Sequence, residues 1–365
     1  MSQNDRNVKL LKDIINIYSP TGHEYEISKF IKEYIEELGF KNVKMDEANN
    51  VYGEIGSGNP KILLCGHIDT VPEKIQVKEK GGEIYGRGSS DAKAPLASML
   101  IATSNLSRDK FNGKIIFVGV VDEEGSGNGI KQVLKDKIDV DYAIFGEPSG
   151  IDNITIGYKG RLCIEIECNT KSVHASAPWL SENSIDKITE VWKEIKQYVK
   201  KNFQESKYNS LSSSITKIYG GNTSNVTPEN AKITLDFRIP HEIKIEEVIM
   251  NIEGIISKFN KKNPSTRTNF KIIDEVKPFE INKNSKLLRA LIRSILKIRG
   301  KRPKLVRKTG TGDMNTLGNQ LEIPVLTYGP GYPHLSHTIN ECVNIEEYLE
   351  SIKIYEETIK ELVRL

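Results

Sequence analysis

The chain has 365 residues, of which 28% are charged and 38% hydrophobic, and its formal net charge at pH 7 is +3. This length exceeds what one hydrophobic core usually serves, so we expect two domains. Lysine and glutamate are interleaved along the helix-like segments and form no single basic stripe, which argues against a nucleic-acid-binding protein.

The sequence also indicates a protein of the reducing cytoplasm. No apolar run reaches the ~18 residues of a membrane span, and residues 1–19 lack the apolar centre and cleavage site of a secretory signal. None of the cysteines, Cys65, Cys163, Cys168 and Cys342, forms a C-x-x-C pair. Buried free thiols are the simpler interpretation, and we therefore predict a cytoplasmic protein without disulfides.

In chain order, helical spacing of apolar residues predicts helices at 9–19 and 27–38. Short apolar runs then predict strands at 51–55, 62–65, 114–121, 142–145 and 324–328. The run at 114–121, KIIFVGVV, is typical of a parallel sheet that is covered by helices on both faces.

Polar residues follow the strand at 62–65. His67 and Asp69 stand two apart, and alternate strand residues face the same side, so their side chains can meet. A metal-bound histidine usually has such a carboxylate behind it. Asp91 follows in the glycine-rich turn GRGSSDAK, before a helix predicted from Lys93 with Pro95 in its first turn.

Other acids and histidines also come just after predicted strands. They are the run 122–124, Glu147, His334 and His337. Open α/β sheets place their ligand sites at these strand ends. A single acid there is usually a solvated loop residue, but the repeated coincidence of histidines and carboxylates favours a site.

Residues 158–276 show a different pattern of predicted strands and helices. Strands predicted at 161–170, 211–219, 232–239 and 269–276, with helices at 184–203 and 245–259, give the order β-α-β-β-α-β of a ferredoxin-like α+β unit. His337 follows this unit, so we expect 158–276 to be inserted into an α/β domain formed by 1–157 and 277–365. That first domain would hold a mostly parallel sheet covered by helices.

The candidate ligands are of mixed type: His67, Asp91, Glu124, Glu147 and His337. Nitrogen and oxygen donors together suit Zn²⁺ or Co²⁺. Five ligands are too many for one catalytic zinc but fit two divalent metals if Asp91 bridges them. A two-metal hydrolase also needs a base that is not a ligand. Spacing alone leaves open which of Asp122, Glu123 and Glu124 is that base.

The segments GHIDTVP, GRGSSDAK, VDEEGSGNG, FGEPSG, SVHAS, GGNTSNVTPENAKITLDFRIP and GPG…SHTINE occur in this order. With them the chain resembles the dinuclear zinc (M20-type) peptidase/deacylase family that includes succinyl-diaminopimelate desuccinylase, acetylornithine deacetylase and carboxypeptidase G. The resemblance covers nearly the whole chain. It implies a catalytic domain with an inserted dimerisation, or lid, domain, and therefore a homodimer.

The resemblance also implies roles for the ligand candidates. Glu123 would be the general base and Glu124 a ligand, while Asp69 would orient His67. Asp91 would bridge the metals, Glu147 would bind the first and His337 the second. His334 would then be a nearby loop histidine.

Further roles are implied outside the ligand set. His174 of the SVHAS segment would stabilise the oxyanion in the partner subunit's site, although its surroundings in the sequence favour a loop or capping histidine. Asn225 and Arg238 match positions that hold the substrate's carboxylate. A planar guanidinium suits that role, but Arg238 could equally pair with an acid across the sheet.

The segment KTGTGDMN at 308–315 resembles the branch that releases lysine or ornithine from an acidic amino-group carrier protein in lysine and arginine biosynthesis. We expect Gly310 and Thr311 to bind substrate there. Ala94 and Pro95 replace glycines that are usual in the family. A basic cluster could attract the carrier, and a solvated loop explains it equally well; it consists of Lys301, Arg302, Lys304, Arg307 and Lys308.

The sequence thus predicts a dinuclear metal-dependent amide hydrolase with zinc or cobalt. The alternatives are a small-molecule deacylase, acting on acetylornithine or succinyl-diaminopimelate, or a metallo-dipeptidase. A non-catalytic metal-binding scaffold is a third alternative, against which the presence of both Glu123 and Asp69 argues. Lysine and ornithine cannot be separated by sequence because the pocket draws on residues of both domains.

Overall fold

The computed structural model describes residues 2–107 and 112–364. The chain divides into two compact units. Unit 1 is Met1–Gly157, Ile281–Arg307 and Gly312–Leu365, and unit 2 is Tyr158–Glu280 and Lys308–Thr311. These limits lie near the expected ones at 157/158 and 276/277, and the assignment of the insert to dimerisation stays a prediction. Within 2–107 and 112–364, no helix is long and apolar enough to span a membrane.

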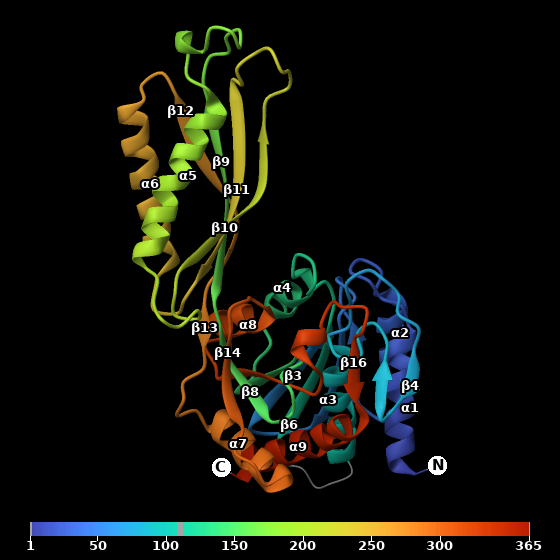
Figure 1. Cartoon of the computed structure of the whole chain (residues 1–365). Coiled ribbons are helices and arrows are strands. Elements are labelled where there is room, and N and C mark those ends of the chain that lie inside the picture. Colours follow the sequence, from blue (N-terminus) through green and yellow to red (C-terminus); the bar gives the residue numbers. More distant parts are fainter. Residues whose placement is uncertain (1, 108–111, 365) are drawn as a thin grey trace. The chain divides into compact units, whose positions relative to one another are not determined.

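Unit 1 is organised around a mixed β-sheet (Figure 1). Its strands lie in the order β1 (Lys41–Met45), β2 (Val51–Gly56), β6 (Lys114–Val120), β3 (Lys61–His67), β7 (Tyr142–Gly146), β15 (Val325–Tyr328) and β8 (Asn153–Tyr158), and β14 (Lys304–Lys308) also pairs with β8. The central strands β6, β3, β7 and β15 are parallel to one another. The flanking pairs β1–β2, β2–β6 and β15–β8 are antiparallel. The predicted mostly parallel sheet is therefore confirmed.

Helices cover this sheet. The helices of unit 1 are α1 (Gln3–Asn16), α2 (Tyr25–Glu37), α3 (Lys93–Leu106), α4 (Asn128–Lys135), α7 (Lys286–Arg299), α8 (Asp313–Leu321) and α9 (Ile345–Arg364). Helix α3 packs on β3, β6 and β7 and is itself covered by α1 and α9, while α2 packs on β1 and β2 and α8 on β15. Because α3 is enclosed on nearly all sides, its sequence is apolar or small around almost its whole circumference.

Helix α3 lies unusually close to the sheet because two strand positions carry no side chain. A Cβ atom added at Gly146 would lie 2.4 Å from Met99 Cε, and one added at Gly66 would lie 2.9 Å from the same atom. The thioether end of Met99 therefore occupies the space above both glycines. A side chain at either glycine would therefore require the flexible end of Met99 to move.

A small sheet of β4 (Lys78–Lys80), β5 (Glu83–Tyr85) and β16 (Cys342–Asn344) joins two distant parts of unit 1. Strand β16 pairs with β5 in antiparallel register. This pairing holds the segment that follows His337 beside the glycine-rich turn that carries Asp91. The short helices are η1 (Pro178–Leu180) and η2 (Pro333–Leu335).

Unit 2 has the predicted β-α-β-β-α-β order. Its strands β9 (Gly160–Asn169), β10 (Ser212–Gly220), β11 (Asn230–Ile239) and β12 (Arg267–Val276) form an antiparallel sheet in the order β10-β11-β9-β12. Helices α5 (Ser184–Lys201) and α6 (Ile245–Lys262) lie side by side against it (Figure 1). Their apolar stripes meet the alternate buried residues of β9 and β11 in one core. The two-residue strand β13 is Phe279–Glu280.

The four cysteines are buried and unpaired, as predicted. Strand β1, by contrast, was not predicted, because its residues KNVKM are mostly exposed at the sheet edge and lack an apolar run. Helix α1 begins earlier than the predicted residue 9, because Ser2 caps it in a reciprocal pair of hydrogen bonds with Asp5.

The buried side chain of Asn50 fixes the acidic loop that follows β6. Its Oδ1 accepts a hydrogen bond from the backbone N of Val121 (3.0 Å), and its Nδ2 donates to the carbonyl of Gly129 (2.9 Å) and to Asp46 Oδ2 (2.7 Å). Both ends of the segment from Val121 to Gly129 are thus held by one amide.

We predict that Asn50→Ala destabilises unit 1 by about 2–4 kcal/mol, because a buried N–H and a buried carbonyl lose their partner. The melting temperature should fall by roughly 5–10 °C. Asn251→Ala on the exposed face of α6, which removes a comparable amide, should leave it nearly unchanged. Equal melting temperatures for wild type and Asn50→Ala in differential scanning calorimetry would show that this amide does not hold the loop.

Candidate metal centre

The predicted ligands of unit 1 meet at the carboxyl ends of its parallel strands. Strands β6, β3, β7 and β15 are neighbours with the same direction, so the residues that follow each of them lie at one edge of the sheet. His67 ends β3, the run 122–124 follows β6, Glu147 follows β7 and His337 lies beyond β15. The fold thus explains why residues up to 270 positions apart, at 67 and 337, can share a site.

Asp91 lies between the two histidines. Its Oδ1 is 3.2 Å from His67 Nε2, and its Oδ2 is 3.4 Å from His337 Nε2. Glu147 Oε1 lies 3.6 Å from His67 Nε2 on one side, and Glu124 Oε1 lies 2.7 Å from His337 Nε2 on the other. Each histidine therefore has one carboxylate of its own and shares the third.

These distances fit a pair of divalent metals. Ligands at ~2.0–2.2 Å from one tetrahedral zinc lie roughly 3.3–3.6 Å from each other, close to most of the separations between the imidazoles and their carboxylates. Two groups have donor atoms mutually within 4.8 Å: His67, Asp91 and Glu124, and His67, Glu123 and Glu147. The nitrogen and carboxylate donors and the shared position of Asp91 are what a bridged two-metal site requires.

Asp69 is fully buried and contacts both the acidic loop and His67. Its carboxylate accepts hydrogen bonds from the backbone N of Glu123 (3.2 Å) and of Glu124 (3.1 Å), and from Thr21 Oγ1 (2.8 Å). It thereby holds the acidic loop as well as the histidine.

His67 Nδ1 lies 3.0 Å from the backbone carbonyl oxygen of Asp69 and 3.5 Å from its carboxylate Oδ1. Both atoms are acceptors, so Nδ1 carries the proton and Nε2 presents its lone pair to Asp91 and Glu147. The tautomer of His67 is thus set mainly by the backbone of Asp69, a contact that sequence spacing does not reveal.

The charges of the site shift one another's pKa. Burial raises the pKa of Glu123 well above its ordinary value, and although His67 opposes this, the charges of Asp313, Glu124 and Asp91 reinforce it. Hydrogen bonds with Asp91 and Glu124 raise the pKa of His337 to about 10. Burial opposes the charged form of His67, yet hydrogen bonds with Asp69 and Asp91 raise its pKa too. The carboxylates of this site therefore stabilise positively charged groups that lie between them.

Asp313 is a site residue that the sequence reading missed. It is the first residue of α8, 6% exposed, and its Oδ2 has no hydrogen-bond partner among the described residues. Burial raises its pKa to about 8, opposed by His67 and reinforced by Asp69 and Glu147. Asp313 belongs to the segment 308–315, whose family resemblance could have indicated it. An acid at the start of a helix, however, is usually a helix-capping group.

Glu341 is a second such residue. Its fully buried carboxylate accepts hydrogen bonds from the backbone N of Ser90 (3.0 Å) and of Asp91 (2.9 Å) and from Arg87 Nη1 (2.7 Å). It therefore holds the turn that carries Asp91. The next peptide, Asp91–Ala92, is cis, which no sequence pattern predicts where the following residue is not proline.

The other predicted residues make different contacts. His334 belongs to η2, with its ring 5.9 Å from the ring of Tyr332, and no interaction with the candidate ligands is found among the described residues. In unit 2, the backbone carbonyl of Asn225 accepts from Ala175 N (2.9 Å), next to His174. Gly310 has open space around the position of a Cβ atom.

Arg238 of unit 2 pairs with an acid of its own strand β11 and, among the described residues, not with one across the sheet. Its Nε donates to Asp236 Oδ1 (2.7 Å), a carboxylate that also accepts from Arg161, and its Nη1 donates to Thr311 Oγ1 (3.3 Å). The bond to Thr311 brings together two of the predicted substrate-binding residues.

Comparison with known proteins agrees with this picture. Residues 63–361 match the profile described as peptidase family M20/M25/M40. The chain is 34% identical to the LysW-lysine/LysW-ornithine hydrolase of Sulfurisphaera tokodaii over 98% of this chain and 96% of that protein. A Pyrococcus furiosus relative, 37% identical over 99% of both chains, carries the same name as a provisional assignment.

Solved structures show the same fold. Aminopeptidase PepT from Bacillus cereus has a TM-score of 0.85 at 20% identity, over 99% of both chains. The YXEP protein of Bacillus subtilis, described as a dinuclear metal binding peptidase from the M20 family, has a TM-score of 0.74 at 16% identity, over 98% of both chains.

We predict that His337→Ala lowers the bound metal by about one ion per chain, because one half of the site keeps only carboxylates. Metal content should be measured by inductively coupled plasma mass spectrometry after equilibration with Zn²⁺. His334→Ala is the matched control and should bind as much metal as wild type. Full metal in His337→Ala and a deficit in His334→Ala would transfer the ligand role to His334.

Proposed function

The chain belongs to peptidase family M20/M25/M40, and from this premise we propose that it releases lysine or ornithine from the side-chain amide of a small acidic amino-group carrier protein, LysW. The observation that carries a hydrolytic function is Asp91, which lies with one oxygen toward each histidine beside the acidic loop. The names of the S. tokodaii and P. furiosus relatives, at 34% and 37% identity, support the carrier-linked substrate.

The ligand roles follow from the distances. His67, Asp91 and Glu147 would hold one divalent ion, and His337, Asp91 and Glu124 the other. When bound, a pair of zinc or cobalt ions lowers the pKa of water and polarises the scissile carbonyl.

Glu123 suits the role of general base. The hydrogen bond from its backbone N to Asp69 fixes its place in the loop beside the candidate ligands. Burial raises the pKa of Glu123, and a carboxylate with a raised pKa more readily holds a proton that it has taken from water. Glu123 would accept the proton of the attacking water and deliver it to the departing α-amine.

His174 suits the stabilisation of an oxyanion. The backbone N of Ser176 donates to its Nδ1 (3.2 Å), so the proton of the neutral ring is on Nε2. The side chain is exposed, and Nε2–H is thus a donor available to a developing negative charge.

A homodimer would bring this donor to a partner's metal centre. Strand β10 is an edge of the unit 2 sheet, and Ile215, Ile218 and Tyr219 on it are exposed. An exposed apolar edge strand is a surface that a second copy of the chain can cover.

Arg238 and Thr311 would hold the substrate's carboxylate. Asn225 and Gly310 would also bind the substrate. The carrier, which is acidic, would dock on the basic cluster Lys301, Arg302, Lys304, Arg307 and Lys308. Of these, Lys301, Arg302 and Lys304 are exposed, so long-range attraction of an acidic partner can act on them.

We predict that Glu123→Gln keeps its metal while turnover falls about 10²–10⁴-fold, because the amide cannot accept the proton. Asp122→Asn changes the neighbouring acid in the same way and should retain most of the activity. Turnover of Glu123→Gln within a few-fold of wild type, at equal metal content, would exclude Glu123 as the base.

The two catalytic proposals can be combined in one experiment. His174→Ala and Glu123→Gln should each be nearly inactive, whereas a mixture that exchanges subunits should regain part of the activity, since some dimers then contain one intact site. A mixture as inactive as its parents, with subunit exchange verified by mass spectrometry, would remove the cross-subunit role of His174.

The substrate proposal is tested by incubating the metal-loaded enzyme with lysyl- and ornithyl-LysW, N-acetylornithine and succinyl-diaminopimelate. We expect release of free amino acid from the carrier only, and slower release at high salt, because the attraction between the charged surfaces is screened. Release from the acyl compounds alone would keep the metal chemistry and assign the protein as a small-molecule deacylase.

A further inference from the structure

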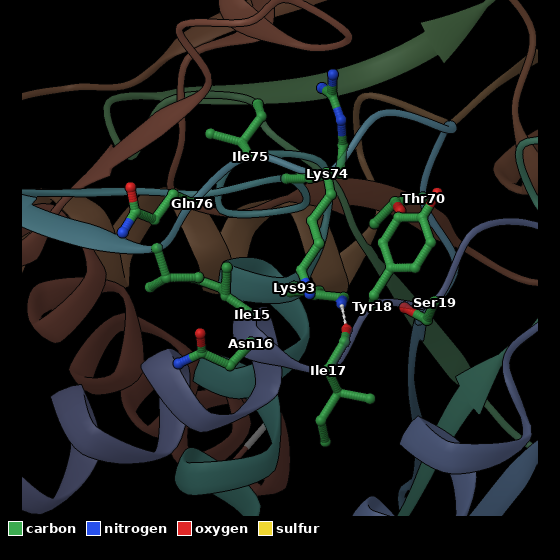
Figure 2. A pocket seen from close by; sticks show the side chains of 12 residues that line it. Ile15, Asn16, Ile17, Tyr18, Ser19, Thr70, Lys74, Ile75, Gln76 and Lys93 are labelled. Atoms are coloured by element: carbon green, nitrogen blue, oxygen red, sulfur yellow. Dashed lines mark hydrogen bonds between the residues drawn. The ribbon is translucent and has the colours of Figure 1, made fainter.

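Unit 1 contains a cavity of about 320 Å³ that is separate from the metal centre (Figure 2). Its walls come from the end of α1 and the turn after it (15–19), from Thr70, from the segment 74–77, and from Arg87 and Lys93. In Figure 2, Tyr18, Ser19 and Thr70 lie on one side, and Ile15, Asn16 and Gln76 on the other. None of the candidate metal ligands lines it.

Three basic side chains line this cavity, one of which, Arg87, is paired with the buried carboxylate of Glu341. They are Lys74, Arg87 and Lys93, and among the described residues that line the cavity there is no aspartate or glutamate. Lys93 is buried, and its Nζ donates to the backbone carbonyls of Ile17 (2.6 Å; dashed in Figure 2) and Ile14 (3.2 Å). These partners are uncharged, and burial lowers the pKa of Lys93 to about 7 although Glu341 and Asp69 oppose this.

Two buried polar groups of the wall have no hydrogen-bond partner among the described residues. They are Arg87 Nη2 and Thr70 Oγ1, on side chains that are 4% and 1% exposed. Arg87 uses its other nitrogens on Glu341, Thr338 and the carbonyl of Glu73. Its Nη2 lies 3.6 Å from the carboxylate of the exposed Glu73, beyond hydrogen-bond distance. A buried unpaired donor is destabilising, and an occupant that supplies acceptors would remove this cost.

We propose that this cavity binds a small anion, a carboxylate or a phosphate, through Arg87 and Thr70 together with the basic side chains of Lys74 and Lys93. Oxygens of such an anion accept from the guanidinium and the hydroxyl together, the geometry for which arginine is suited. The volume lies at the lower limit of small-molecule sites, which suits a ligand the size of an amino acid or a simple phosphate.

The ligand would contact both supports of the metal centre. Thr70 follows Asp69, whose carboxylate holds the acidic loop, and Arg87 binds Glu341, whose carboxylate holds the turn of Asp91. An anion that fixes Thr70 and Arg87 therefore stabilises the arrangement that places the ligands. This site would be an effector site for whichever small anion the cell supplies.

The experiment is thermal unfolding of the metal-loaded protein in phosphate, acetate and succinate at constant ionic strength, with chloride as the reference. We expect a saturable rise of the melting temperature with phosphate or with a carboxylate. Whichever anion gives the larger rise identifies the class of the ligand. No saturable rise with any of them would overturn the proposal.

Two variants locate the binding. Thr70→Val keeps the volume and backbone contacts of Thr70 and should weaken the anion about tenfold. Lys74→Gln, at an exposed residue of the wall, should weaken it about threefold, whereas Lys78→Gln on β4 should not change it. Binding that is unaffected by both wall variants would also overturn the proposal.

Anions can also bind to metal ions, and the same titration of His337→Ala separates the two sites. An anion response that persists in this variant supports the cavity. A response that disappears there but survives in Thr70→Val places the anion at the metal centre and contradicts the proposal.

Discussion

The structure of unit 1 depends on a concentration of negative charge that the fold must hold together. Around the imidazoles of His67 and His337 lie the carboxylates of Asp69, Asp91, Glu123, Glu124, Glu147 and Asp313. Like charges at such distances repel strongly where water is excluded. The carboxylates stay together because backbone N–H groups bind Asp69 and Glu341 and because four parallel strands fix the residues that follow them. The resulting field suits divalent cations.

Much of this arrangement was predictable because it depends on local patterns. Apolar runs identified the central strands, and the order of elements identified the ferredoxin-like unit. The polar residues after those strands gave the ligand candidates, which the structure brings together at distances that fit a metal pair. Where spacing left the acids of 122–124 open, the family resemblance chose Glu123 and Glu124, and their roles stay predictions.

What was not predictable depends on contacts between distant segments or on backbone geometry. Glu341 binds the turn of Asp91 across 250 residues, and no local pattern marks it. The proton of His67 Nδ1 faces a backbone carbonyl where a carboxylate was expected. The four residues Lys308–Thr311 join unit 2 although the chain on both sides of them belongs to unit 1. Strand β1 escaped prediction because an exposed edge needs no apolar run.

The position of β15 has a consequence for how the protein is made. In the sheet it lies between β7 and β8, although it follows them by more than 160 residues in the chain. A ribosome therefore releases most of the acids, and then all of unit 2, before β15 can fill its place and His337 can arrive. Until then the unfinished sheet keeps two unpaired strand edges and an uncompensated cluster of acids. The candidate metal centre is thus complete only after β15 and His337 have been synthesised, whereas unit 2 has a core of its own and can fold earlier.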